Sequence, residues 1–138
     1  MARIRPFKAI RPVRDKASLV ATRSYLTYSD ETIAEKLNHN PYTFLHIINP
    51  DYKSNTKTSG IQKFNLVKKK FNQFINEDIL KKDSSENYYI YQKQNELNKF
   101  TGIIAACSVD DYLENKIKKH EQTLSKREKM FCEYLDTT

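Results

Sequence analysis

Apolar residues follow a helical spacing in three parts of the chain. The longest pattern follows Gly60, where a face of apolar side chains alternates with lysines and predicts an amphipathic helix over Ile61–Ile75. A second helix is expected over Asp30–Leu37, because Ser29 offers a hydroxyl cap and the first turn is acidic. A third is expected over Lys126–Leu135. The apolar face of the longest helix consists of Ile61, Phe64, Val67, Phe71, Phe74 and Ile75.

Three shorter apolar runs have the length and residue types of strands. Tyr42–Ile48 and Tyr88–Tyr91 are rich in aromatic and β-branched residues, and Gly102–Val109 is almost wholly apolar. The polar segment between the second and third runs is short, which favours an antiparallel hairpin. His46 lies inside the first run and is expected to be a core residue that donates to a backbone carbonyl. Together the patterns predict an α+β fold, a small mixed or antiparallel sheet that includes Thr43–Ile48 and packs against helices.

Length and charge narrow the classes of protein that fit. A chain of 138 residues fits a single domain, expected here over residues 1–138, that folds without metal or disulfides. The formal net charge of +7 would attract phosphates, nucleic acid or acidic surfaces. A basic surface that serves only solubility explains the same charge.

The cysteines and the N-terminus point to a reducing compartment. Cys107 and Cys132 have no neighbour at metal-ligand or redox spacing, so we expect both to be small core residues and no metal site. The chain starts without an apolar leader and contains no membrane-length apolar run. A cytoplasmic protein without a membrane partner is therefore expected.

The candidate functional site is the basic loop that follows the last apolar run. Lys118 and Lys119 precede an adjacent His120–Glu121 pair, and Ser125 with Glu128 has the spacing of a capping box at a helix start. A helix N-terminus attracts anions, and Glu121 or His120 could transfer a proton. We expect phosphate or ligand binding by Lys118, Lys119, Thr123, Ser125 and Arg127, with His120 and Glu121 catalytic. The ligand would be a nucleotide or another small phosphate-bearing molecule, with Mg²⁺ as a possible companion ion. A turn organised by His120 and Glu121, with Ser125 only as a cap, is the alternative.

Four segments carry a resemblance to a known family. The chain resembles the N-terminal part of the bacterial "domain of unknown function 1015" family, in a form most similar to those of Bacteroidetes-type bacteria. Family members are longer, so the resemblance implies a truncated chain whose partner would be the missing C-terminal portion. Where the family usually has Tyr-Asp, this chain has Tyr25-Leu26. The segments are Pro6–Pro12, Asn40–His46, Tyr88–Tyr91 and Thr101–Arg127.

Three hypotheses for function follow, and the resemblance assigns no activity that would decide whether the chain is an enzyme. The first is a ligand-binding or phosphotransfer module that uses the loop between Lys118 and Arg127. The second is a nucleic-acid-binding module, in which Tyr88, Tyr89 and Tyr91 would stack on bases. At least one of these rings is expected in the core, because Tyr88 and Tyr89 point to opposite faces of a strand. The third is a non-catalytic fragment that needs the rest of the family's chain.

Overall fold

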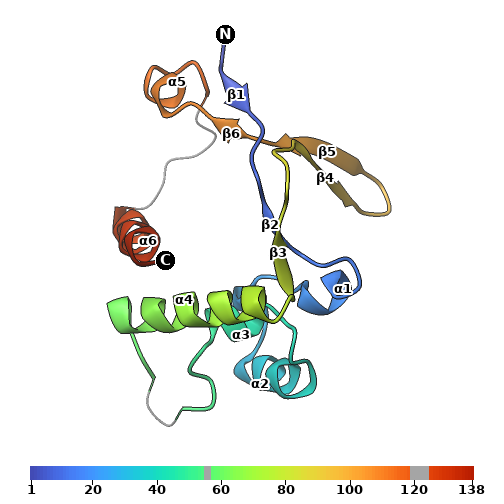
Figure 1. Cartoon of the computed structure of the whole chain (residues 1–138), viewed down its shortest axis with the longest axis vertical. Helices are drawn as coiled ribbons and strands as arrows, with labels where there is room; N and C mark the ends of the chain where they lie inside the picture. The colour runs from blue at the N-terminus through green and yellow to red at the C-terminus, as the bar shows by residue number, and fades with distance from the viewer. Residues whose placement is uncertain (55–56, 119–124) are drawn as a thin grey trace. The chain divides into compact units, whose positions relative to one another are not determined.

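The computed structural model describes residues 1–54, 57–118 and 125–138. Its chain divides into two compact units (Figure 1). Unit 1 consists of Met1–Arg11 and Lys82–Gln122, and unit 2 of Pro12–Lys81 and Thr123–Thr138. The boundaries fall within strands β2 (Ile10–Pro12) and β3 (Leu80–Lys82), which pair with each other. Among the described residues, no helix has both the length and the apolar character needed to cross a membrane.

Unit 2 contains the hydrophobic core. The predicted amphipathic helix is α4 (Gly60–Asn76), and it buries Val67 and Phe74 while Phe71 is half-buried. Ile61, at the start of the apolar face, is exposed. The short helix α1 (Ala17–Val20) contributes Val20. The buried cluster is Val20, Ile47, Val67, Phe74, Ile79 and Leu80.

Helix α2 (Asp30–His39) confirms the helix expected from the Ser29 cap. The hydroxyl of Ser29 accepts a hydrogen bond from Thr32 N at 3.3 Å, and Asp30 and Glu31 occupy the first turn. The helix ends before Pro41, since a residue that precedes proline is driven out of the α region. A short 3₁₀ turn, η1 (Tyr25–Thr27), precedes α2.

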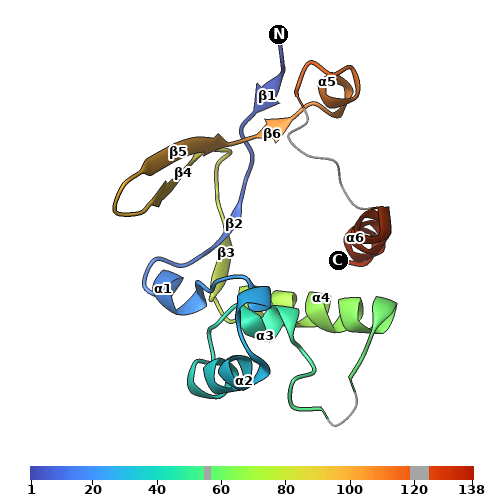
Figure 2. The same cartoon turned by 180° about the vertical axis from the view of Figure 1, so that it is seen from behind.

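The strand predicted over Thr43–Ile48 is wrong, because this run contains helix α3 (Leu45–Ile48), which packs against α4 (Figure 2). The polar residues just before it start the turn: Asn40 Oδ1 accepts from Tyr42 N at 3.0 Å, and Thr43 Oγ1 accepts from Leu45 N at 3.4 Å. The helical turn buries both Leu45 and Ile47. These local hydrogen bonds outweigh the β propensity of the run.

The expectation for His46 is confirmed. Its imidazole Nε2 lies 3.0 Å from the carbonyl oxygen of Asn40, and its ring meets the Tyr52 ring with centroids 5.5 Å apart. Burial lowers the pKa of His46, because the neutral ring is favoured away from water. The histidine therefore belongs to the packing of α3.

The predicted C-terminal helix is α6 (Ser125–Thr137). It packs against α4 in unit 2, where the rings of Phe64 and Tyr134 meet edge to face with centroids 5.4 Å apart. Lys68 Nζ donates to the carbonyl oxygen of Thr137 at 3.0 Å, which satisfies a free carbonyl at the helix end. Phe131 and Leu135 remain 55% and 71% exposed, so only part of the predicted apolar face of α6 is covered.

Unit 1 is built from two small antiparallel sheets. Strand β1 (Ile4–Arg5) pairs with β6 (Ala106–Cys107), and the isolated bridge Phe7–Asn87 continues the contact along the N-terminal segment. The predicted hairpin is confirmed as β4 (Tyr89–Gln94) paired with β5 (Lys99–Ile104) (Figure 2).

The apolar run Gly102–Val109 is divided among three elements rather than forming one strand. Strand β5 ends at Ile104, β6 covers Ala106–Cys107, and Val109 begins helix α5 (Val109–Leu113). Ser108 ends the extended run because its hydroxyl accepts from Asp111 N and caps α5. The prediction of buried cysteines is also wrong, since Cys107 and Cys132 are both exposed. The α+β class itself is confirmed by the presence of helices together with small two-stranded sheets.

Candidate functional site

The structure describes only part of the loop predicted to bind phosphate. Lys118 is exposed at the end of the described part of unit 1. Lys119, His120, Glu121 and Thr123 lie outside the described residues. Ser125 and Arg127 belong to the first turn of α6 in unit 2, and their side chains lie outside the description. The start of the loop is therefore the part whose surroundings are known.

A buried carboxylate anchors the start of this loop to the N-terminal strand. Asp111, on α5, is 1% exposed, and its Oδ2 accepts from Arg3 N at 2.7 Å and from Arg3 Nε at 3.1 Å. Arg3 Nη2 donates to Asp111 Oδ1 at 3.2 Å and to Ser108 Oγ at 3.0 Å. Hydrogen bonds from Arg3 hold the pKa of Asp111 well below its usual range, so the carboxylate stays ionised.

The same aspartate also holds the chain that leads to Lys118. Its carbonyl oxygen accepts from Lys116 N at 2.9 Å and from Ile117 N at 3.1 Å, and Lys116 Nζ reaches Asp111 Oδ1 at 3.4 Å. Asn115, with φ of 59°, makes the left-handed turn that brings these amides back to the helix end. Asp111 thus fixes Arg3 on one side and the start of the loop on the other.

A small cavity lies along the paired strands β1 and β6. It has a volume of about 230 Å³ and is lined by Arg3, Arg5, Ala106, Cys107 and Ser108. The Arg3 charge is offset by Asp111 and by Asp110, whose Oδ2 lies 3.6 Å from Arg3 Nη2. The Arg5 guanidinium makes no hydrogen bond or ion pair with the residues that the structure describes, so it is available to an anion.

A second polar cluster in unit 1 fastens the hairpin to the N-terminal segment. The hydroxyl of Tyr89 lies 2.6 Å from Asp83 Oδ2, 3.0 Å from the carbonyl oxygen of Phe7 and 2.9 Å from Ala9 N. Asp83 also accepts from Arg11 Nη2 at 2.7 Å and from Arg11 Nε, and these bonds lower its pKa. Tyr89, Asp83 and Arg11 each bond to a neighbour in this cluster, which indicates a structural role.

Sequence reasoning missed the roles of Asp83, Tyr89 and Asp111 as anchors. The sequence shows Asp110–Asp111 as an acidic turn, whereas the structure separates an exposed aspartate from a buried one. The spacing Ser108-x-x-Asp111 at the end of an apolar run was the signal that could have revealed the cap. The expectation that at least one of Tyr88, Tyr89 and Tyr91 lies in the core is not met. Tyr88 and Tyr91 are exposed, and Tyr89 is only half-buried, with its ring 5.1 Å from that of Phe7.

A comparison with models of protein families identifies the family to which the chain belongs. Residues 4–138 match the model described as "Protein of unknown function (DUF1015)". The chain belongs to this DUF1015 family. Neither the search of curated proteins nor the search of solved structures gave a match. Leu26 stands where the resemblance leads us to expect Asp. Its side chain is 65% exposed on η1, so it contributes little to the core.

Proposed function

We propose that the chain binds a small phosphate-bearing molecule, a nucleotide or phosphorylated metabolite, at the basic surface where strand β1 meets the start of the Lys118 loop. The observation that supports this best is the Asp111 network. It joins Arg3 of β1 and Lys116 to one carboxylate, so the segments that carry Arg5 and Lys118 are both attached to Asp111 in unit 1. Arg5 and Lys118 supply charge that the neighbouring aspartates do not offset.

The part of the loop beyond Lys118 adds the proposed chemistry. Lys119 would neutralise phosphate charge, and His120 or Glu121 would accept or donate a proton if the bound molecule reacts. A carboxylate such as Glu121 is also a suitable ligand for a Mg²⁺ ion carried by a nucleotide. Thr123, Ser125 and Arg127 belong to unit 2 and remain candidates for phosphate contacts on their own. These roles are part of the proposal and follow from the residue types.

Calorimetric titration with pyrophosphate tests the proposal. Arg5→Gln and Lys118→Gln should each weaken binding about tenfold, because a hydrogen bond to a charged group contributes about 1.5–3 kcal/mol. Both should also flatten the salt dependence, since fewer exposed charges then attract the ligand. Lys69→Gln, an exposed lysine of α4 in unit 2, is the matched control and should bind as the wild type does. Equal affinity in all four proteins would contradict the proposal.

Glu121→Gln separates binding from catalysis. The amide keeps the shape of the side chain but cannot accept a proton, so any turnover should be lost while pyrophosphate affinity stays within about twofold. Turnover that survives this substitution would remove Glu121 from the proposed chemistry. Loss of binding would instead assign Glu121 to ligand or Mg²⁺ contact.

The hairpin favours a second candidate function, binding of single-stranded nucleic acid. The register places Phe100 opposite Lys93 and Tyr91 opposite Gly102, so two aromatic rings and a lysine share one face. Phe100 is 63% exposed and Tyr91 56% exposed, as bases that stack on them would require. Oligonucleotide retention that falls with salt and is lost in Tyr91→Ala and Phe100→Ala would support this function. Retention equal to that of wild type in both variants would exclude the hairpin as the binding surface.

A further inference from the structure

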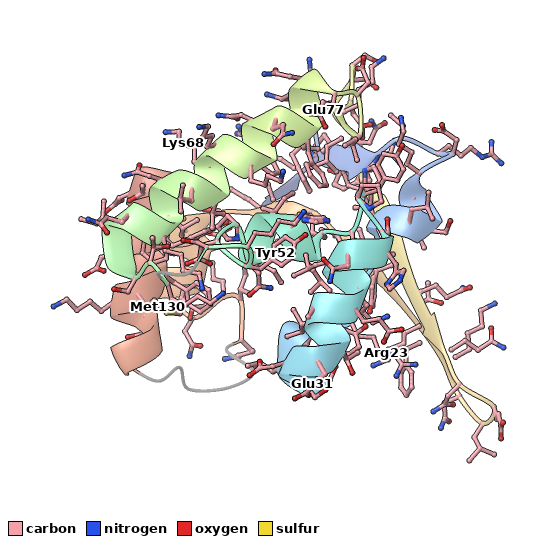
Figure 3. The ribbon with its side chains drawn as sticks, turned by 90° about the horizontal axis from the view of Figure 1, so that it is seen from below. Arg23, Glu31, Tyr52, Lys68, Glu77 and Met130 are labelled. Atoms are coloured by element: carbon pink, nitrogen blue, oxygen red, sulfur yellow. The ribbon has the colours of Figure 1, made fainter. Side chains whose placement is uncertain are left out.

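Unit 2 contains a cavity that the proposed function does not use. Its volume is about 420 Å³, within the range of roughly 300–1,000 Å³ typical of small-molecule sites. One wall is an apolar part of α2 formed by Ile33, Ala34 and Leu37. Opposite it lie the segment after α3 and the beginning of α4. Figure 3 labels Tyr52, which lines this cavity and donates from its hydroxyl to the carbonyl oxygen of Leu37 at 3.4 Å.

A buried carboxylate lines the polar side of the cavity. Asp51 is 8% exposed, and its Oδ2 accepts from Thr58 N at 2.7 Å and from Thr58 Oγ1 at 2.9 Å. The backbone N–H of Thr58 lowers the pKa of Asp51, so this carboxylate is charged at neutral pH. The backbone N–H of Asp51 itself also lowers this pKa. A carboxylate has about four lone-pair sites, so it can accept a further hydrogen bond beside those from the protein.

An amide donor lines the same cavity. Asn49 Nδ2 is buried and has no hydrogen-bond partner in the described part of the chain. A buried amide without a partner is destabilising, and a ligand that accepts its hydrogen bond would remove this cost. Asn49 and Asp51 therefore offer one donor and one acceptor beside an apolar wall.

We infer that this cavity binds a purine nucleoside or nucleotide, with the base lying on the α2 wall. A purine presents an amino or imino N–H beside a ring nitrogen or carbonyl acceptor, the complement of a carboxylate next to an amide N–H. Its flat apolar face suits the surface of Ile33, Ala34 and Leu37. A small zwitterion would match the polar groups of Asp51 and Asn49. It would leave the apolar side chains of the α2 wall without a partner.

Two lysines at the rim extend the site to phosphates. Lys63, in the first turns of α4, is half-buried, and Lys57 is exposed. Lys57 Nζ donates to the carbonyl oxygen of Asp51 at 3.3 Å, which keeps its ammonium close to the cavity. A 5′-phosphate should therefore add affinity to that of the nucleoside. The inference rests on unit 2 alone and does not require the site proposed in unit 1.

Titration of the full chain with adenosine, guanosine, their 5′-monophosphates and pyrophosphate tests this inference. At least one nucleoside should bind saturably, and its monophosphate more tightly. Asn49→Asp keeps the side-chain shape but replaces the donor with an acceptor, and Ala34→Leu fills the wall with a good helix former. Each should weaken nucleoside binding at least tenfold. Lys63→Gln should reduce the preference for the monophosphate and leave nucleoside binding within twofold, and Lys69→Gln is the matched control.

The variants also separate the two sites. Arg5→Gln and Lys118→Gln should alter pyrophosphate binding but not nucleoside binding, and Asn49→Asp should do the reverse. Ala34→Leu provides the same readout if Asn49→Asp does not fold, as judged by far-ultraviolet circular dichroism. Two results would overturn the inference: no saturable binding of either nucleoside by the wild type, or nucleoside affinity unchanged in folded Ala34→Leu.

Discussion

Two carboxylates show how strongly the surroundings of a single residue decide its role. Asp110 and Asp111 are adjacent, yet the side chain of Asp110 is 75% exposed and that of Asp111 is 1% exposed. The buried carboxylate accepts from both the backbone and the guanidinium of Arg3. Among the residues that the structure describes, the Asp110 carboxylate makes a single longer contact, with Arg3, which screening by water and salt weakens.

Replacing Asp111 by Asn should loosen the attachment of the N-terminal strand. The amide cannot accept all the hydrogen bonds from Arg3 and Lys116, and a cation would lose its buried partner. We expect a lower urea midpoint and faster hydrogen exchange of Ser108 N, which bonds to the carbonyl oxygen of Arg3. Asp110→Asn is the matched control and should shift the midpoint little. Equal shifts in the two variants would contradict the anchoring role.

The lowered pKa of Asp111 predicts how the stability of the folded chain depends on pH. Hydrogen bonds from Arg3 depress the pKa of Asp111 in the folded chain, below the value of about 3.9 expected when unfolded. Its contribution to stability is therefore complete above that value and is lost as pH falls through the lower folded pKa. A carbon-13 NMR titration should give a midpoint for Asp111 well below about 3.9. A midpoint at or above that value would show that the hydrogen bonds from Arg3 to Asp111 are absent in solution.

At the scale of elements, spacing predicted the long helix, but the short apolar runs were ambiguous. The buried face of α4 could be predicted because apolar residues, among them Val67 and Phe74, recur at helical spacing over several turns. Tyr42–Ile48 offered too few residues to distinguish a strand from a buried helical turn. Its conformation depends on bonds from Asn40 and Thr43, which a propensity scale does not count. The hairpin was predictable because two strand-like runs flank a polar turn.

The core face of α4 gives a graded prediction. Phe74 is 1% exposed, so Phe74→Ala should destabilise the chain by about 3–5 kcal/mol through lost burial and a cavity. The ring of Phe71 is only half-buried, and Phe71→Ala should cost less. Phe131→Ala, at an exposed site on α6, should change the unfolding free energy by less than about 1 kcal/mol. Chemical denaturation measures all three, and a reversed order of Phe74 and Phe71 would contradict the packing described.

The hairpin should depend on one hydroxyl. Tyr89→Phe keeps the ring against Phe7 but leaves Ala9 N and Asp83 without their contact, at a cost of about 1–3 kcal/mol. Tyr91→Phe removes a hydroxyl from an exposed ring on the same strand and should be nearly neutral. Thermal unfolding compares the two variants. Equal melting temperatures would show that the Tyr89 cluster does not hold the hairpin in solution.

At the scale of the molecule, the sequence predicted the α+β class and the DUF1015 family. It could not predict that Arg3 and Lys116 both bind the Asp111 carboxylate. The basic residues near the N-terminus and Lys118 are more than a hundred positions apart, and pairing of β1 with β6 connects their surroundings. Such long-range pairing depends on backbone register, which residue types alone leave open. A single domain over residues 1–138 remains a prediction beside the two compact units.

Amide chemical-shift mapping with nitrogen-15-labelled protein and pyrophosphate tests the central claim most directly. The proposed phosphate site predicts saturable shifts at Arg5, at Ala106–Ser108 and at Lys118, with small shifts at Lys68, Lys69 and Lys70 of α4. Arg5→Gln and Lys118→Gln should weaken the fitted affinity about tenfold, as expected for a charge-assisted contact. Shifts that do not saturate, or that spread evenly over all lysine-bearing surfaces, would contradict a phosphate site at β1 and the Lys118 loop.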